Sequence, residues 1–163
     1  MLIKVKNKDT LIFGDFSFRC ALGKKGTSSK KKEGDFCTPK GSFRLKTVYY
    51  RSDRIKNIKT KLDLKKINYN MGWCNDPNSK KYNSLIKIHE KISHEKLYRR
   101  DNKYDIFVVV DYNFKNPVPF KGSAIFLHLT KNFRKTAGCI VLNKNDLLIL
   151  LRLIDKRTKI KIS

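Results

Sequence analysis

The sequence predicts a mainly β domain, a sandwich or barrel of mixed strands that carries one substantial helix. Three observations predict it. Short segments of β-branched and aromatic residues, of which residues 105–110 are the clearest, recur between turn residues. Only one segment, after Cys139, has the spacing of an amphipathic helix. The length of 163 residues is typical of one domain, so we expect residues 1–163 to form a single one.

The first elements are short strands. Residues 2–5 and 10–13 alternate apolar and polar side chains, and Gly14-Asp15 is a turn signal. Residues 16–22 are therefore expected to be the returning strand of a hairpin.

A basic, turn-rich region follows the hairpin. Residues 23–32 are glycine, serine and lysine apart from Thr27, which indicates a flexible basic loop. Residues 34–41 are rich in turn formers and residues 42–50 alternate as a strand. The spaced Ile and Leu of residues 51–66 decide neither helix nor strand.

Residues 67–104 read as a long polar and aromatic insert. Loops of this length are usually functional or disordered, and this insert is too aromatic for a plain linker. We interpret it as a lid or substrate wall, with Trp73 and His94 as candidate substrate contacts. Packed structural aromatics are the equally favoured alternative.

The second half supplies a buried strand, a helix and a closing strand. Residues 123–129 are mostly apolar and predict a central strand with His128 near its end, and residues 158–162 predict a last strand. Asn143 is the expected helix N-cap, with Asp146 at N3. The core side of that helix is expected to hold Leu147, Leu148, Leu150, Leu151 and Ile154.

One histidine and one cysteine are placed as in a cysteine acyl-transfer site. A catalytic thiol needs a base, which His128 offers to Cys139. The small residues Thr136-Ala137-Gly138 leave room for substrate and let the backbone N–H groups of Gly138 and Cys139 face an oxyanion. A buried packing cysteine and a hydrogen-bonded core histidine are the alternative reading.

Composition narrows the classes of partner. With 40% hydrophobic residues the chain is not disordered, and the net charge of +24 attracts nucleic acid, an anionic lipid surface or a carboxylate-bearing cell-wall polymer. Lysine makes up 29 of the 38 basic residues, which disfavours nucleic-acid reading by arginine forks.

The four cysteines follow no C-x-x-C spacing, so we expect neither a disulfide framework nor a bound metal or cofactor. Cys20 and Cys37 are expected to be packing residues. A zinc site from Cys74, Asp76, His89 and His94 is conceivable but lacks a second thiolate. Residues 1–6 show no signal-peptide core, and no apolar run reaches the length of a membrane span.

Several motifs resemble the catalytic domains of L,D-transpeptidases of the YkuD type. His128 followed by residues 136–142 (TAGCIVL) is similar to the family's histidine and its Ser/Thr-His-Gly-Cys segment. Residues 34–43 resemble its segment of Thr-Pro-x-Gly followed by an aromatic residue. Residues 72–77, 93–95 and 111–113 resemble a compact branch, so the similarity runs from about Cys20 onward.

Two family positions differ here. The histidine before Gly-Cys is Ala137, and the arginine two residues after the cysteine is Val141. The spacing from His128 to Cys139 is also shorter than in better-known members. The resemblance therefore transfers the nucleophile to Cys139 and the base to His128, and nothing to Ala137 or Val141.

The resemblance implies an acyl transfer on peptidoglycan stem peptides through a Cys139 thioester, without cofactor, in the cell envelope or periplasm. The cytoplasm is the alternative location, since the sequence shows no signal peptide. Backbone groups of Gly138 would hold the oxyanion, and Thr136, Ala137 and Ser123 would contact substrate. L,D-carboxypeptidase or amidase hydrolysis by the same dyad is one alternative. A non-catalytic basic module that binds nucleic acid or cell-wall polymers is another, although no nucleic-acid-reading motif is present.

Overall fold

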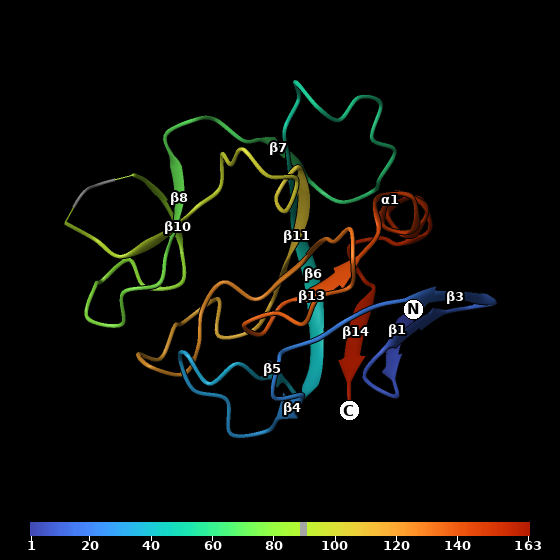
Figure 1. The fold of residues 1–163 in the computed structure, drawn as a ribbon, viewed down its shortest axis with the longest axis horizontal. Helices are drawn as coiled ribbons and strands as arrows, with labels where there is room; N and C mark the ends of the chain where they lie inside the picture. The colour runs from blue at the N-terminus through green and yellow to red at the C-terminus, as the bar shows by residue number, and fades with distance from the viewer. Residues whose placement is uncertain (89–90) are drawn as a thin grey trace.

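A nine-stranded mixed sheet organises the molecule, in a computed structural model that describes residues 1–88 and 91–163. Eight of its strands follow one another in the order β13-β12-β11-β6-β14-β1-β2-β3, and β7 pairs with β6 (Figure 1). The strands are β1 (Leu2–Lys6), β2 (Thr10–Phe13), β3 (Phe16–Arg19), β6 (Gly41–Tyr50), β7 (Leu64–Lys66), β11 (Ile106–Val110), β12 (Phe126–Leu129), β13 (Ile140–Leu142) and β14 (Lys159–Ile162). The pairs β1–β14, β6–β7 and β12–β13 are parallel. The predicted mainly β fold of mixed strands, a near-closed barrel-like sheet with one helix, is confirmed.

The long strand β6 joins the two halves of this sheet. Its first residues pair with β14, where Arg44 lies opposite Lys159, and its later residues pair with β11, where Val48 lies opposite Val108. The register shifts between Val108 and Val110. Because such an irregularity bends and twists a strand, β6 and β11 curve the sheet between its two halves.

The first hairpin is shorter than predicted. The turn at Gly14-Asp15 is confirmed, but β3 ends at Arg19 rather than at residue 22. The N–H of Cys20 donates to the carbonyl of Asp9, and Ala21 then forms an antiparallel bridge with Val141 of β13. After β3 the chain therefore pairs with β13, which lies at the opposite end of the strand order.

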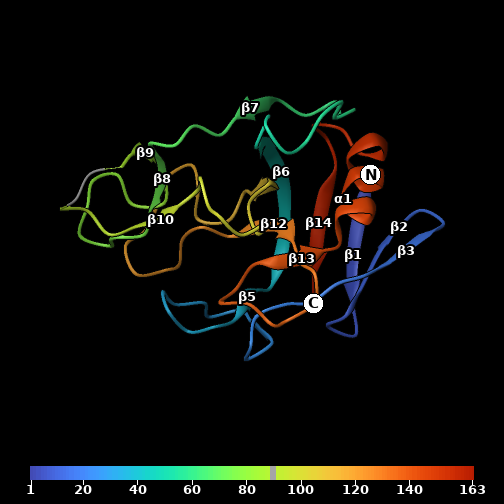
Figure 2. The same ribbon diagram turned by 45° about the horizontal axis from the view of Figure 1, so that its top comes forward.

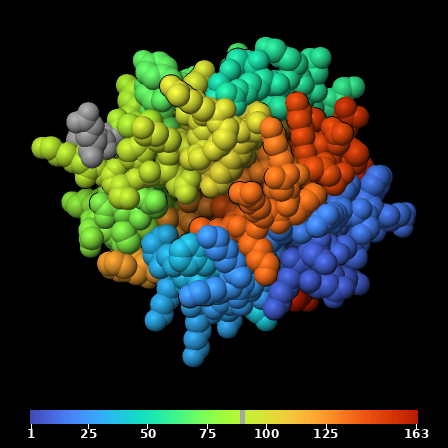
Figure 3. Space-filling view, viewed as in Figure 1, coloured from blue at the N-terminus to red at the C-terminus, as the bar shows by residue number. Residues whose placement is uncertain are grey.

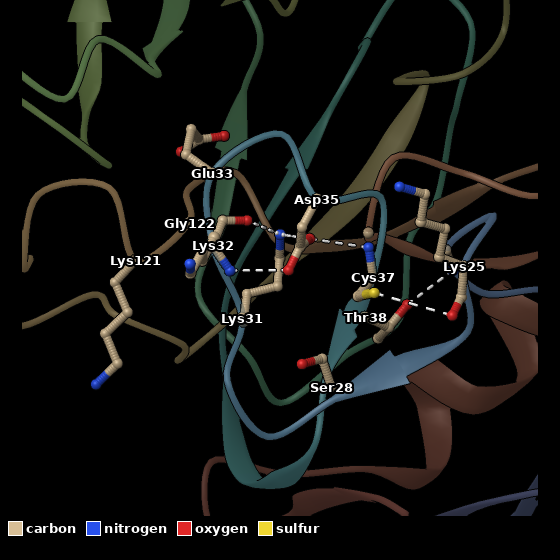
Figure 4. Close-up of polar contacts among 12 residues, drawn as sticks. Lys25, Ser28, Lys31, Lys32, Glu33, Asp35, Cys37, Thr38, Lys121 and Gly122 are labelled. Carbon is tan, nitrogen blue, oxygen red and sulfur yellow. Dashed lines mark hydrogen bonds and ion pairs between the residues drawn. The ribbon is translucent and has the colours of Figure 1, made fainter.

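The basic loop has more structure than its composition predicted. Its residues Thr27–Ser28 form β4, which pairs in parallel with β5 (Thr38–Pro39). The carboxylate of Asp35 accepts hydrogen bonds from Lys31 Nζ at 2.5 Å, from Lys32 N at 2.8 Å and from Cys37 N at 2.9 Å (Figure 4). The turn-forming and charged residues of this segment thus form an ordered loop around the carboxylate of Asp35.

The aromatic insert builds a small sheet of its own. Its strands lie in the order β10-β8-β9, with β8 at Met71–Cys74, β9 at Leu85–Lys87 and β10 at His94–Lys96. The side chains of Trp73, Tyr82 and Tyr104 are buried. Figures 1 and 2 both show this small sheet on the side of the molecule opposite β1–β3. The undecided segment 51–66 contributes β7 and otherwise irregular chain.

The single helix α1 (Lys144–Leu153) forms as the sequence predicts. Asn143 is its N-cap and accepts a hydrogen bond from the N–H of Asp146 at 2.9 Å. Leu147, Leu150, Leu151 and the C-cap Ile154 are buried, while Leu148 is partly buried against the same core. Among the described residues, no helix is long and apolar enough to cross a lipid bilayer.

The two faces of the sheet carry different cores. The face under α1, here called the aliphatic face, is formed by Val48, Ile106, Val108, Val110, Leu127, Ile140 and Leu142 with the buried side chains of α1. The other face, here called the aromatic face, is formed by Tyr49, Trp73, Tyr104, Phe107 and Phe126, and it includes Cys139. Strand alternation separates the two sets, because neighbouring residues point to opposite faces.

Candidate active site

The parallel pair β12–β13 brings His128 and Cys139 to the aromatic face. Leu127 lies opposite Ile140 and His128 opposite Val141, so Cys139, the residue before β13, adjoins Phe126. Phe126 and His128 are two residues apart and share a face of the strand. His128 and Cys139 both line a cavity of about 90 Å³, here called the thiol cavity.

A tight turn fixes the approach to Cys139. The Thr136 hydroxyl accepts a hydrogen bond from the N–H of Gly138 at 3.0 Å and donates to the carbonyl of Cys139 at 2.6 Å. Gly138 has a φ of 150°, and a Cβ there would lie 2.8 Å from the carbonyl oxygen of Cys37. Only glycine fits this close approach of the basic loop to the turn.

The thiol of Cys139 is buried and neutral in its resting state. The side chain is 8% exposed, and Sγ donates to the carbonyl of Ala124 at 3.1 Å while accepting from Phe126 N at 3.4 Å. Burial raises the pKa of Cys139 to about 11, although Lys103 and the Phe126 N–H act in the opposite direction. The thiolate is therefore not preformed at neutral pH.

The imidazole of His128 presents an unused lone pair. Its Nδ1 lies 2.9 Å from the carbonyl of Leu129, which can only accept, so the neutral ring carries its proton on Nδ1. Nε2 is buried and has no hydrogen-bond partner within residues 1–88 and 91–163. Burial, followed by the charge of Lys103, lowers the pKa of His128 to about 3. His128 is thus a neutral base whose free nitrogen is kept from water.

The small-sheet insert supplies a polar cluster on the cavity wall. Tyr104 donates its hydroxyl to Glu95 Oε2 at 2.7 Å, and its ring meets the His128 ring edge-on at 5.3 Å between centroids. Lys103 Nζ lies 3.9 Å from Glu95 Oε2 and 4.7 Å from the centroid of the Tyr104 ring. Glu95, Lys103 and Tyr104 all line the thiol cavity.

The basic loop supplies the facing wall. Glu33 Oε2 accepts hydrogen bonds from the hydroxyls of Ser123 at 2.7 Å and Tyr82 at 2.5 Å. Lys31 is 7% exposed, bonds Asp35, and also lines the cavity. The cavity therefore contains a cation and a carboxylate from each of two separate segments.

Asn83 connects the small sheet to the thiol. Its Oδ1 accepts from Trp73 Nε1 at 2.9 Å and from the N–H of Ala124 at 3.0 Å, and its Nδ2 donates to the carbonyl of Asn113 at 2.6 Å. Ala124 in turn accepts the thiol of Cys139, with a φ of 52° that few non-glycine residues adopt. Asn83 is 3% exposed, and its side chain holds the Ala124 backbone beside the thiol.

A second and larger hollow adjoins the thiol cavity. It has a volume of about 320 Å³ and shares Lys103, His128, Thr136 and Ala137 with that cavity. We call it the outer hollow. Figure 3 shows the basic loop, the insert and the segment before β13 meeting on one face of the molecule. His128 and the turn before Cys139 therefore lie between the thiol cavity and the outer hollow.

The structure gathers most of the residues selected from the sequence. Cys139, His128, Gly138, Thr136, Ala137 and Ser123 all line the thiol cavity. Trp73 and His94 do not. Trp73 is 2% exposed and packs edge-on against Phe126, and the His94 ring lies against Gly72 within the small sheet. For these two, the structure places the side chains as packing groups, in line with the alternative reading of the insert.

Several wall residues had no usable signal in the sequence. Lys31 and Glu33 lie about 100 residues before Cys139. Lys31 belongs to the loop whose composition predicted only flexibility, and Glu33 directly follows that loop. Lys103, Glu95 and Asn83 lie in the insert whose fold the sequence did not predict. Glu95 alone belongs to a segment, residues 93–95, that carried a family resemblance.

The cysteines and metal alternatives are also placed. Cys20, Cys37, Cys74 and Cys139 are all free thiols. The conceivable zinc site counted His89, which lies outside the described residues. Within the described ranges, no three or more His, Cys, Asp or Glu side chains gather as metal ligands.

Comparison with known proteins agrees with the geometry. The model of the L,D-transpeptidase catalytic domain, YkuD, matches residues 3–162, nearly the whole chain. Comparison with curated proteins finds no match.

Proposed function

The chain belongs to the YkuD family of L,D-transpeptidase catalytic domains, and we propose that it transfers the acyl group of a peptidoglycan stem peptide through a thioester on Cys139. Membership implies peptidoglycan cross-linking activity of the L,D-transpeptidase type. The observation that carries the finer proposal is the unpartnered Nε2 of His128, a residue that lines the same cavity as the buried thiol of Cys139.

The first half-reaction forms the thioester. His128 Nε2 takes the Cys139 proton as Sγ attacks the carbonyl carbon of a diamino-acid residue in the stem. The tetrahedral intermediate then breaks its carbon–nitrogen bond. The terminal D-amino acid leaves with the proton returned from Nε2.

The second half-reaction resolves the thioester. The amine of a second stem attacks the same carbonyl, His128 accepts the amine proton, and Sγ leaves and is reprotonated. The products are a new amide cross-link and the free thiol. The base can serve both halves because His128 lines both the thiol cavity and the outer hollow.

Proton transfer and attack are concerted in this proposal. A thiol of raised pKa beside an imidazole of lowered pKa does not form an ion pair at rest. The thiolate gains stabilisation from the Phe126 N–H and from Lys103 as it develops. Lys103 is our candidate for the cation that Val141, in the family's arginine position, does not supply.

The oxyanion is assigned to the backbone N–H groups of Cys139 and Gly138. In the resting structure Gly138 N donates to the Thr136 hydroxyl, so it must exchange that partner when substrate binds. The exchange is local, because Thr136 Oγ1 also donates to the Cys139 carbonyl and stays in place.

The two spaces suit two substrates. The thiol cavity holds only a small group, such as the scissile unit, while the outer hollow accepts a larger one. Ala137 borders both, and a histidine at that position would occupy space between them. Because Ala137 is exposed, water also has a route to the thioester, which favours carboxypeptidase activity as the second candidate.

Family members typically act in the cell envelope, and we place this activity there. The test is intact-mass measurement of the protein after incubation with a tetrapeptide stem, with and without an amine acceptor. We expect a mass increase equal to the acyl group and release of the terminal D-amino acid. Amide product marks transpeptidation, and free acid marks hydrolysis.

Three variants control this test. Cys139→Ala should abolish the adduct and His128→Ala should slow its formation, whereas Cys37→Ala, which removes a thiol outside the cavity lining, should leave both unchanged. No adduct and no released D-amino acid from the folded parent would overturn the proposal.

A further inference from the structure

One face of the first hairpin and its neighbouring strands is built almost entirely from cations and small polar residues. On β1 and β14, side chains alternate between the core and solvent. Ile3, Val5, Ile160 and Ile162 are buried in the core that includes α1. The residues between them face solvent. With their neighbours on β3 and β6 they form what we call the cationic face: Lys4, Lys6, Arg19, Arg44, Lys159 and Lys161.

The strand register arranges these cations in adjacent rows. Lys159 lies between Arg44 and Leu2, and Lys161 lies directly beside Lys4. Like charges at paired positions of a sheet repel and lower stability. Five strands at the usual spacing of about 4.8 Å give this face a width of roughly 20 Å. It is a two-dimensional array of like charges that the fold tolerates at a cost.

The cationic face also lacks countercharges. None of its six cations takes part in an ion pair within the described ranges, whereas Lys31, Lys46 and Arg54 elsewhere each have an aspartate partner. Of the nearby carboxylates, Asp63, which shares a hollow with Arg44, pairs with Lys156 at 2.6 Å. Asp9 accepts from the Thr10 hydroxyl, and the exposed Asp15 lies in the hairpin turn, so these two carboxylates border the face without forming an ion pair with its cations. Arg19 stacks over Phe133 but keeps its charge exposed.

We propose that the cationic face docks the protein onto the surface of an anionic lipid bilayer. A bilayer is itself a flat sheet of negative charge, and lysines near it contribute additively to binding. Figures 1 and 2 show β1–β3 at the edge of the molecule, away from the small sheet. A linear polyanion would instead use a groove or a single track of charge.

Apolar side chains among these cations support a lipid partner. Leu2 is 39% exposed and lies beside Lys159, and the half-buried Ile12 lies opposite Lys4. Phe16 is 45% exposed but lies opposite the buried Phe13, so it points to the other face of the hairpin. Apolar side chains beside lysines are the combination that enters the headgroup region of a membrane.

Nucleic acid is less well matched. Single-strand binders stack bases on aromatic rings, but the outward positions of β1, β14 and the start of β6 hold no aromatic residue. Four of the six cations are lysines rather than the arginines that fork to phosphates and bases.

This inference is independent of the catalytic proposal, because none of the six cations lines the thiol cavity or the outer hollow. The test is co-sedimentation of the full chain with vesicles of phosphatidylglycerol and phosphatidylcholine, and with phosphatidylcholine vesicles alone. We expect binding only to the anionic vesicles, weakening as salt is raised.

The variant K4E/K159E is designed to preserve the fold. Each new glutamate lies opposite a remaining cation, Lys161 or Arg44, so like-charge repulsion becomes attraction and thermal stability should be unchanged or higher. Its affinity for anionic vesicles should fall at least about tenfold. The matched control K80E/K87E alters two exposed lysines of the small-sheet insert and the net charge by the same amount, and should change affinity less than about twofold.

Equal weakening of both variants would overturn the proposal, because net charge rather than the cationic face would then govern binding. Absence of parent binding to anionic vesicles would also overturn it. A third outcome would also overturn it: the parent binds duplex DNA or polyglutamate more tightly than anionic vesicles, and K4E/K159E loses that binding but keeps vesicle binding. Turnover of a soluble tetrapeptide by K4E/K159E should match the parent, which separates this outcome from failure of the catalytic site.

Discussion

The aliphatic and aromatic faces of the large sheet have similar burial but different chemistry. Under α1, the packed groups are Leu, Ile and Val, such as Leu150 and Ile140, with no exposed surface. On the other face, rings such as Trp73 and Tyr104 surround a thiol and an imidazole. Trp73 and Tyr104 have polar edges that donate to Asn83 and Glu95. The aromatic face therefore provides both low polarity and fixed hydrogen bonds.

The two faces of one sheet therefore have different roles: the aliphatic face contributes mainly to stability, and the aromatic face holds the candidate reactive groups. An aliphatic core contributes to stability mainly through the burial of apolar surface, and it has no hydrogen-bonding groups that could orient a reactive side chain. Aromatic residues with polar tips bury area and anchor a network at the same time. We expect substitutions on the aliphatic face to lower stability with little effect on turnover, and substitutions on the aromatic face to lower turnover with little effect on stability.

The largest expected effect comes from Cys139→Ser on the aromatic face. A buried hydroxyl is a far weaker nucleophile than a thiol, so release of the D-amino acid should fall on the order of 10⁴-fold. The free energy of unfolding, measured in urea, should change by less than about 1 kcal/mol because volume and contacts are nearly kept. A large loss of stability would show that the two faces do not divide these roles.

Leu150→Ala on the aliphatic face should give the opposite signature. The side chain is fully buried on α1, so truncation leaves a cavity and should lower the free energy of unfolding by about 2–5 kcal/mol. Turnover per folded molecule should stay within about twofold of the parent. The measurement is a urea titration together with a titration of active sites, and a large fall in turnover per folded molecule would contradict the division.

The pH dependence of stability should single out His128. Its pKa is lowered from 6.5 to about 3 in the folded state, so the unfolded chain binds the proton first and the stabilisation present above pH 6.5 is lost as the pH falls toward 3. Between neutral pH and about pH 4.5 this amounts to about 2–3 kcal/mol.

His128→Leu should remove that part of the acid sensitivity, and urea titrations at the two pH values measure it. Lowered aspartate pKa values such as that of Asp35 remain in both proteins and cancel in the difference. Equal sensitivity in His128→Leu and the parent would contradict a buried neutral imidazole.

The smallest effect is expected from Lys103→Met. Lys103 lowers the pKa of Cys139, so its removal should shift the alkaline rise of thiol alkylation to higher pH and reduce turnover by roughly tenfold. Lys121→Met, an exposed lysine that lines neither space, is the matched control. If both variants behave alike, Lys103 contributes only to the general positive potential.

Much of the fold could be predicted from local patterns. The hairpin turn at Gly14-Asp15, the strand around Val108 and the cap at Asn143 each depend on residues close together in the sequence. Local patterns failed where pairing was distant. Strand β3 ended early because Ala21 bridges Val141, and the basic loop was ordered by contacts to Asp35 and to Gly138.

The pair Cys139 and His128 was selected from the sequence because both residue types and the small turn are local features. Their family was visible for the same reason. The sequence by itself determined the helix, most strands of the large sheet and the candidate pair Cys139 and His128, since side-chain alternation and capping act over a few positions.

Only the tertiary structure decided the electrostatics of the site. The wall residues Lys31, Glu33, Glu95 and Lys103 come from two segments that reach Cys139 through long-range packing. Trp73 turned out to be a buried support rather than a cavity residue. The physical reason is that pKa values and solvent access depend on burial and on charges a few ångströms away in space, whatever their separation along the chain.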